Sequence, residues 1–396
     1  MKYDFITKVD RSNQGSSKWA LMYKTKEDVS KDIVPLSVAD MEFKHPKELI
    51  DGLKNYLDEV VLGYTFGDET FRDSVVHWMK RRRKFEIKPE WIVNTPGVVP
   101  AIFNAVKTFS KEGDGIVVMP PVYYPFYNAI KVNNRKVVEC PLIENDGHYT
   151  IDYEKFDSLT MNPKNKTLIF CSPHNPVGRV WTKEELLKLA KIIKKNKVFL
   201  LSDEIHFDLI LKGNTHTVFQ TLDEEIADNM ITFTAPSKTF NLAGMGISNI
   251  IIKNDILREK FQKGLEETAG VPHSALGYKA CEIAYNECES WLDELLEVID
   301  DNQKMMKNFF VANYPKIKCP LIEGTYLQWV DFRDLNMTNE ELENFMINEA
   351  ELFLDEGYIF GENGSGFERF NLAVPKSVLN DALKRLDAAL KKIGYK

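Results

Sequence analysis

The stretch MITFTAPSKT, residues 230–239, joins an apolar run to a Pro-Ser-Lys-Thr turn. A continuous apolar run of this length, without alternation, is typical of a strand that is covered on both faces. Four more such runs lie at residues 115–119, 167–171, 198–201 and 248–252, with longer amphipathic segments between them. The chain is therefore predicted to be an α/β protein with a mostly parallel sheet between helices.

The segment before the run at 198–201 has a clear helix start. Thr182 is a candidate N-cap, and Glu185 three residues later completes a capping box. Trp181 can pack on Leu186 as a hydrophobic staple. This segment predicts a strand–helix–strand unit.

The pattern changes near residue 285. Helical periodicity from Trp291 to Phe309 gives way to shorter elements. We predict a large domain at 46–284 and a smaller α+β domain formed by 1–45 and 285–396. The elements expected in its C-terminal part are a strand at 325–330, a helix at about 340–351, a turn-rich segment at 361–366, a strand around Phe370 and a closing helix.

Composition narrows the classes of function. The 396-residue chain has a net charge of −8, which argues against nucleic acid as a main partner. No run approaches the roughly 20 apolar residues of a membrane helix, and the N-terminus lacks a signal-peptide pattern. The five cysteines are scattered and the seven histidines show no ligand spacing. We predict reduced thiols, a cytoplasmic location, and neither a metal nor a membrane partner.

Four polar or aromatic residues follow separate apolar runs. Tyr123, Asn175, Asp203 and Lys238 each come after a different run. In an open α/β sheet, ligands bind outside the carboxyl ends of the strands. The four side chains are therefore expected to meet at one site.

Together these residues meet the needs of pyridoxal 5'-phosphate (PLP). Lys238 can form a covalent link to the cofactor aldehyde and later act as a base, and Asp203 can keep the ring nitrogen protonated. Asn175 can donate to the ring oxygen, and Tyr123 can stack on the ring, although Tyr124 competes for that position. Taken singly, each has an ordinary alternative: a surface lysine, a loop acid or an Asn-Pro turn. Lys238, Asp203 and Tyr123 form the predicted catalytic set.

The segment TPGVVPA, residues 95–101, opens a predicted helix. Free backbone N–H groups at a helix start can bind phosphate. A simple turn between a strand and a helix is the alternative.

These motifs resemble those of the fold-type I PLP enzymes of the class I/II aminotransferase superfamily, over essentially the whole chain. The resemblance implies an aspartate aminotransferase-like fold, with a seven-stranded type of sheet in the large domain. Within the superfamily, VADMEF at 38–43 and SDEIH at 202–206 are similar to the cystathionine β-lyase-like branch of carbon–sulfur lyases. True aminotransferases tend to have a tyrosine where this chain has His206.

For the cofactor, the resemblance implies that Lys238 holds PLP, Asp203 pairs with the ring nitrogen, Asn175 bonds the ring hydroxyl and Tyr123 stacks on the ring. Val98 and Val99 would supply phosphate-binding amides.

The resemblance also implies contacts to the substrate and to a second subunit. Arg369 would bind the substrate α-carboxylate, since a guanidinium fork suits that group, and Asn175 and Ala39 would lie beside it. Apart from the resemblance, His206 could contact the cofactor or the substrate, or be a buried histidine whose hydrogen bonds are satisfied within the protein. Tyr64 would reach the phosphate of a neighbouring subunit, which implies a homodimer with shared sites.

Two positions depart from the family pattern. Many relatives have a phosphate-binding basic residue where this chain has Gly246. Its place would have to be taken by Ser237, backbone amides and a tyrosine, or by a lysine from elsewhere in the chain. The lyase motif usually has a tryptophan at the position of Ser37, which affects the expected shape of the substrate pocket.

The sequence therefore predicts a PLP-dependent carbon–sulfur β-lyase that converts cystathionine or a related cysteine S-conjugate to a thiol, pyruvate and ammonia. An aminotransferase acting on an α-amino acid is the nearest alternative, because Lys238 would serve both reactions. A PLP-binding regulatory protein is the third.

Overall fold

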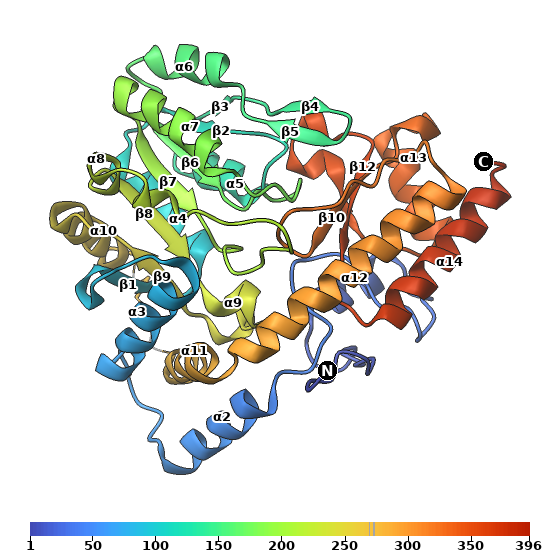
Figure 1. Ribbon diagram of the computed structural model, residues 1–396, viewed down its shortest axis with the longest axis horizontal. Coiled ribbons are helices and arrows are strands. Elements are labelled where there is room, and N and C mark those ends of the chain that lie inside the picture. Colours follow the sequence, from blue (N-terminus) through green and yellow to red (C-terminus); the bar gives the residue numbers. More distant parts are fainter. Residues whose placement is uncertain (269, 272–273) are drawn as a thin grey trace.

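The structure is a computed structural model that describes all of residues 1–396 except 269, 272 and 273. It contains a seven-stranded sheet in the order β1-β9-β8-β7-β6-β2-β3, in which β9 runs antiparallel to both of its neighbours (Figure 1). The other pairings are parallel. The predicted α/β fold with a mostly parallel sheet is confirmed. The strands are β1 (Ile92–Thr95), β2 (Gly115–Val118), β3 (Lys136–Glu139), β6 (Thr167–Cys171), β7 (Phe199–Asp203), β8 (Met230–Thr234) and β9 (Ser248–Ile251).

Two strands of this sheet have no matching apolar run in the sequence. β1 contains Asn94 and Thr95, and β3 is an edge strand whose Lys136 and Glu139 are exposed. An edge strand needs less apolar surface, because it has one neighbour and more contact with water. The run at 198–201 also extends further than expected, so that Asp203 is the last residue of β7.

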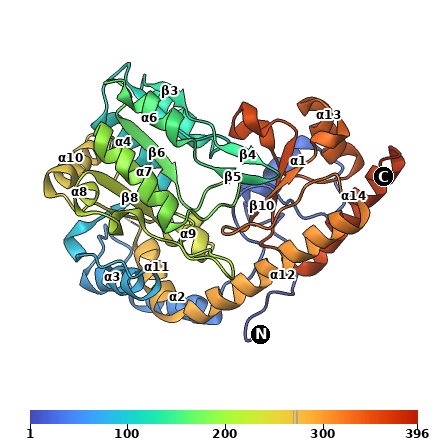
Figure 2. The same ribbon diagram turned by 45° about the horizontal axis from the view of Figure 1, so that its top comes forward.

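Successive side chains of the central strands enter two separate cores. Leu168, Phe170 and Leu200 belong to one core, while Ile169 and Leu201 belong to the other. Both faces of the sheet are therefore covered, as the continuous apolar runs predict. Figures 1 and 2 show the helices on the two sides. One face packs against α6 (Tyr153–Met161), α7 (Lys183–Asn196) and α8 (Glu224–Ala227), and the other against α4 (Val98–Phe109), α5 (Pro125–Val132) and α10 (Asp255–Glu266).

The capping box predicted for α7 is present. Thr182 Oγ1 accepts from the Glu185 amide at 3.2 Å, and Glu185 Oε2 accepts from the Thr182 amide at 2.8 Å. Trp181 is fully buried in the same core as Leu186 and donates its indole N–H to the Cys171 carbonyl at 3.0 Å. These contacts fix α7 to the end of β6.

A second, antiparallel sheet has the order β10-β12-β11. Its strands β10 (Leu327–Asp331) and β12 (Phe367–Asn371) correspond to the strands predicted near 325–330 and Phe370. The predicted helix at 340–351 is different: α13 (Asn339–Asn344) continues as a π-helix at Phe345–Glu349. The remaining elements are β11 (Asp355–Glu356), α1 (Ser17–Thr25), α2 (Lys47–Glu59), α3 (Glu69–Arg83), α9 (Pro236–Thr239), α11 (Ala275–Glu287), α12 (Glu289–Asn313), α14 (Lys376–Lys392) and the hairpin of β4 (Ile143–Asn145) and β5 (His148–Thr150).

The N-terminal segment is bound to the second sheet. Backbone hydrogen bonds of 2.9 Å join the Leu36 amide to the Phe353 carbonyl and the Glu42 amide to the Ala373 carbonyl. Helix α12 extends from α11 toward the second sheet and α14 (Figure 2). The exact domain boundary stays a prediction. In the part of the chain that the structure describes, no helix combines the length and apolar character needed to cross a membrane.

Candidate active site

A cavity of about 200 Å³ lies at the carboxyl ends of the parallel strands. Most of the predicted site residues line it, although they come from separate parts of the chain. These residues are Ala39, Val98, Val99, Tyr123, Asn175, Asp203, His206, Ser237 and Lys238.

The topology of the sheet explains why these residues meet. Asp203 ends β7, and Lys238 lies in α9, the single helical turn that follows β8. Strand β1 has the same direction as β8, because both are antiparallel to β9. The start of α4 therefore reaches the same edge, where the first-turn amides of Val98 and Val99 have no partner within the helix.

Lys238 is held by a backbone carbonyl. Its Nζ donates to the Ala39 oxygen at 2.7 Å. Burial, together with the nearby Arg369 guanidinium, lowers the pKa of Lys238 to about 8. A pKa near 8 gives the side chain an appreciable neutral fraction at neutral pH, as nucleophilic attack requires.

Asp203 is the acid of the cavity. Only 3% of its surface is exposed, and its Oδ1 accepts from the Ile205 amide at 3.1 Å. Burial raises the pKa of Asp203 to about 7. Among the described residues, no side chain hydrogen-bonds to this carboxyl group, so a protonated ring nitrogen could supply the missing partner.

Asn175 and Arg369 form the adjacent polar corner. Arg369 Nη1 donates to Asn175 Oδ1 at 2.8 Å, and Nη2 donates to Asp355 Oδ2 at 2.5 Å. The guanidinium lies 4.7 Å from the centre of the Phe360 ring. Its Nε is buried and has no partner among the described residues. A substrate carboxylate could use that donor.

Sequence reasoning missed Asp355. It lies in β11, a strand of two residues with no periodic pattern, so only the fold places it beside Arg369.

His206 lies in the cavity wall as a neutral side chain. Burial lowers its pKa well below the usual value, and the charges of Lys238 and Arg369 add to this effect. Its Nδ1 is buried without a partner in the described part of the chain. The ring is therefore available to a ligand.

The structure separates the two tyrosines that compete for the stacking position. Tyr123 lines the cavity, whereas Tyr124 is 39% exposed and does not line it. Tyr64 lies away from this cavity and is 93% exposed. Ring stacking by Tyr123 or Tyr124, and the contact of Tyr64 with the phosphate of a neighbouring subunit, stay predictions.

The two departures from the family pattern also have places in the fold. Gly246 adopts a φ of 59°, in the left-handed region that favours glycine. Lys238 is the only lysine, and no arginine occurs, among the described residues that line the cavity. Ser237, Ser248 and the α4 amides are there to meet a phosphate. Ser37 is buried and lies outside the cavity lining.

These features fit PLP. The cavity offers a lysine with a lowered pKa, an acid that lacks a charged partner, a helix start with free amides and an aromatic wall. Each meets a different part of the cofactor: its aldehyde, ring nitrogen, phosphate and ring face.

Comparison with known proteins agrees with this fit. Residues 31–386 match the family of class I and II aminotransferases. The cystathionine beta-lyase PatB of Bacillus subtilis is 40% identical over 91% of this chain and 93% of its own. The crystal structure of cystalysin from Treponema denticola, which contains pyridoxal 5'-phosphate, has 59% identity and a TM-score of 0.98 over 99% of this chain and 100% of its own. The PLP-bound C–S lyase of Staphylococcus hominis has 31% identity and a TM-score of 0.91, with 98% of each chain covered.

Proposed function

The chain belongs to the class I and II aminotransferase family as a PLP-dependent enzyme of the carbon–sulfur lyase type, and from this premise we propose that it cleaves cystathionine or related cysteine S-conjugates. The products would be a thiol, pyruvate and ammonia. The observation that carries the proposal is the meeting of Lys238 and Asp203 in one cavity, with Arg369 hydrogen-bonded to the Asn175 side chain of the cavity wall. A PLP-dependent reaction of an amino acid needs all three: Lys238 as the amine that acts as a base, Asp203 as the partner of the ring nitrogen, and Arg369 as the group that binds the carboxylate.

Lys238 would perform the proton transfer. Its lowered pKa lets the amine accept the proton from the substrate Cα at neutral pH. When bound, the cofactor supplies a pyridine ring that withdraws electrons from that carbon. Asp203 would keep the ring nitrogen protonated, because an acid buried without a charged partner gains from a nearby cation.

Arg369 would orient the substrate. Asn175 and Asp355 hold Nη1 and Nη2, each of which keeps a second N–H, and the buried Nε has no partner in the described part of the chain. These remaining donors would bind the α-carboxylate. The guanidinium is already fixed over Phe360, so little side-chain entropy is lost on binding.

The proposal includes a homodimer and a cytoplasmic location. Four apolar or aromatic side chains between α2 and α3 are exposed: Val61 by 89%, Leu62 by 65%, Tyr64 by 93% and Phe66 by 64%. An apolar loop of this kind is typical of a surface that another chain covers. In a dimer with shared sites, Tyr64 would reach the phosphate of the neighbouring subunit. The five free, buried cysteines support a reducing compartment.

Product analysis tests the function. The PLP-loaded protein is incubated with cystathionine, and separately with an amino acid plus 2-oxoglutarate. We expect pyruvate together with a free thiol in the first reaction. Glutamate without thiol would instead identify an aminotransferase and refute the lyase proposal. The absence of turnover with any amino acid would favour a PLP-binding regulator.

A further inference from the structure

The turn at residues 38–40 has a strained backbone beside the cavity. Val38 has a φ of 52°, which is an outlier for a β-branched residue. Asp355 Oδ2 accepts from the Val38 amide at 2.8 Å, and Asn371 Nδ2 donates to the carbonyls of Val38 at 2.8 Å and Asp40 at 2.6 Å. Such strain persists only where the surroundings over-determine the conformation, and it is concentrated at functional sites.

The strained turn presents the Ala39 carbonyl to the cavity. This oxygen accepts from Lys238 Nζ at 2.7 Å and from Tyr326 Oη at 2.9 Å. Both lone pairs of the carbonyl are therefore used. Ala39 contributes to the site through its backbone.

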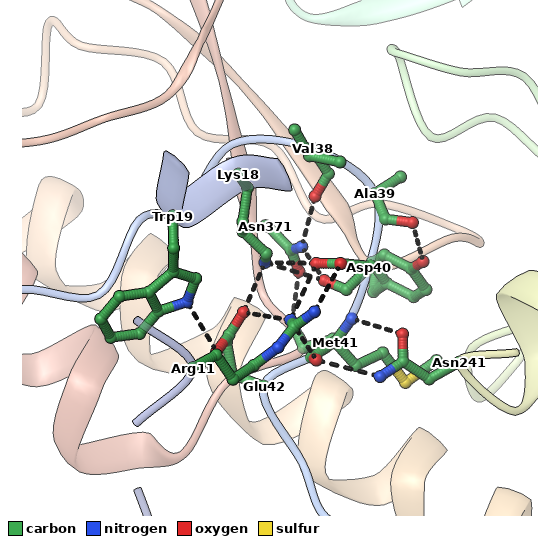
Figure 3. Close-up of polar contacts among 12 residues, drawn as sticks. Arg11, Lys18, Trp19, Val38, Ala39, Asp40, Met41, Glu42, Asn241 and Asn371 are labelled. Carbon is green, nitrogen blue, oxygen red and sulfur yellow. Dashed lines mark hydrogen bonds and ion pairs between the residues drawn. The ribbon is translucent and has the colours of Figure 1, made fainter. Parts of the chain in front are cut away.

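A buried ionic cluster lies behind the turn (Figure 3). We call Arg11, Lys18, Asp40 and Glu42 the Lys18 cluster. The side chain of Lys18 is fully buried, and its Nζ lies 2.8 Å from Asp40 Oδ1 and 2.9 Å from Glu42 Oε1. Arg11 pairs with the same two acids at 3.0 and 2.8 Å. Buried pairs of this kind add little net stability, but removal of one partner is costly, so they fix geometry.

The two acids of the cluster differ in what they fix. Lys18 Nζ also donates to the Asp40 carbonyl at 3.0 Å, so residue 40 is held through both its side chain and its backbone. Glu42 instead accepts from the indole of Trp19 at 3.3 Å. Asp40 therefore determines the orientation of the neighbouring Ala39 carbonyl, while Glu42 attaches the cluster to α1.

We propose that the Ala39 carbonyl is the docking site of the Lys238 amine whenever that amine is not bound to the cofactor, and that Asp40 is the positioning residue that fixes this carbonyl through the Lys18 cluster. The inference rests on the proposed role of Lys238, which has to be released for the substrate amine. A released amine in a buried cavity needs an acceptor. A carbonyl oxygen accepts from both an amine and an ammonium group, so docking does not prevent proton transfer.

The charges around Lys238 support this assignment. Asp40 and Asp203 raise its pKa, while Arg369 and Lys18 lower it. The neutral His206 is a further titratable neighbour, since the charge of Lys238 contributes to its lowered pKa. Glu42 is not among the largest influences on the pKa of Lys238, whereas Asp40 is.

The two acids of the cluster provide a matched pair of variants. Asp40→Asn and Glu42→Gln each remove one negative charge from the Lys18 cluster with little change in volume. The full-length, cofactor-free protein is treated with an amine-acylating reagent between pH 6 and 10, and the modification of Lys238 is followed by peptide mass spectrometry. Because only the neutral amine reacts, the rate reports the protonation of Lys238 without any turnover.

We expect a half-maximal rate near pH 8 in the parent protein. Asp40→Asn should shift this midpoint down and raise the rate at pH 7 by about threefold, since an anion near the amine is lost. Glu42→Gln should shift the midpoint less than Asp40→Asn does, because Glu42 is not among the largest influences on the pKa of Lys238. Equal midpoints in the two variants would overturn the proposal.

Tyr326→Phe keeps the inference testable if Asp40→Asn does not fold. It leaves the Lys18 cluster intact and frees one lone pair of the Ala39 carbonyl, so the midpoint should rise. An unchanged midpoint would show that this carbonyl does not hold the amine. Loss of lyase activity alone would refute the proposed function and leave this measurement unaffected.

Discussion

Asp203 and Asp208 belong to the same segment, which begins in β7, but the two buried carboxyl groups have different numbers of hydrogen-bond and ionic partners. Asp208 is fully buried and accepts from Trp78 Nε1 at 2.9 Å, Arg83 Nε at 3.1 Å and Thr239 Oγ1 at 3.0 Å. Asp203 accepts one backbone N–H, and burial raises its pKa to about 7. Asp208 therefore fixes the framework, whereas Asp203 is left to be completed by a ligand.

Two buried lysines differ in the same way. Lys18 is buried with two carboxylates within 3 Å, while Lys238 is held by a neutral carbonyl. Buried charges without charged partners lower stability, and natural proteins tolerate them at functional sites. Buried charged groups that have charged partners thus stabilise the fold, whereas those that lack charged partners are the ones predicted to bind the cofactor and the substrate.

Replacement of Lys238 should have the largest effect. Lys238→Ala is expected to lower lyase activity by about 10³-fold, because both the covalent link and the base are lost. The visible absorbance of the lysine-bound cofactor should also disappear. Lys304→Ala, an exposed lysine in α12, is the control and should change neither property. A Lys238→Ala protein that kept the absorbance would assign the covalent link to another residue.

The two aspartates provide the direct test of the comparison. In the cofactor-free protein, Asp208→Asn should lower the free energy of unfolding by about 3 kcal/mol, because Arg83 loses its buried partner. Asp203→Asn should not lower it. Urea unfolding at pH 7 measures both, and equal losses would contradict the distinction.

The pH dependence sharpens this prediction. A folded-state pKa near 7, raised from 3.8, means that folded Asp203 binds a proton more tightly than the unfolded chain does. This group therefore makes the cofactor-free protein less stable as pH rises from about 4 to 7. Asp203→Asn should remove that part of the slope.

Arg369 should show a smaller effect that is confined to the substrate. Arg369→Lys keeps the charge but loses the fork, so kcat/KM should fall by about 30-fold with little change in cofactor absorbance. Arg333 is a suitable control, since its half-exposed guanidinium lies 4.6 Å from the centre of the Phe367 ring in the same sheet. Arg333→Lys should leave kcat/KM unchanged. A similar loss in both variants would indicate a structural effect.

The smallest predicted effect tests the framework alone. Thr182→Ala removes the N-cap of α7 and should lower the free energy of unfolding by about 1 kcal/mol. Activity per folded molecule should not change. Thr338→Ala, in the second capping box at α13, is the comparison with the same chemistry in the smaller sheet.

Continuous apolar runs made the central strands predictable, because burial on both faces leaves a plain signal in the sequence. β3 could not be predicted in the same way, since Lys136 and Glu139 flank only two valines. The residues at strand ends were predictable because parallel strands bring their carboxyl ends together. Lys238 could be located in this way, but its lowered pKa depends on burial in the complete fold and on Arg369, which is far away in the sequence.

Residues whose importance arises from tertiary contacts were not predictable. Lys18 looks like a surface lysine of an amphipathic helix, yet its side chain is fully buried. Asp355 lies in a segment without periodicity, and only the pairing of β11 with β12 places it beside Arg369. Neither position carries a local signal, because its chemistry depends on residues distant in the chain.

The attachment of the N-terminal segment has a consequence for synthesis. Residues 36 and 42 hydrogen-bond to residues 353, 371 and 373, which leave the ribosome more than three hundred codons later. At about 5–20 residues per second, the first segment waits on the order of half a minute for its binding surface. The Ala39 carbonyl therefore reaches Lys238 only after translation is nearly complete, so the last step of assembly closes the catalytic site.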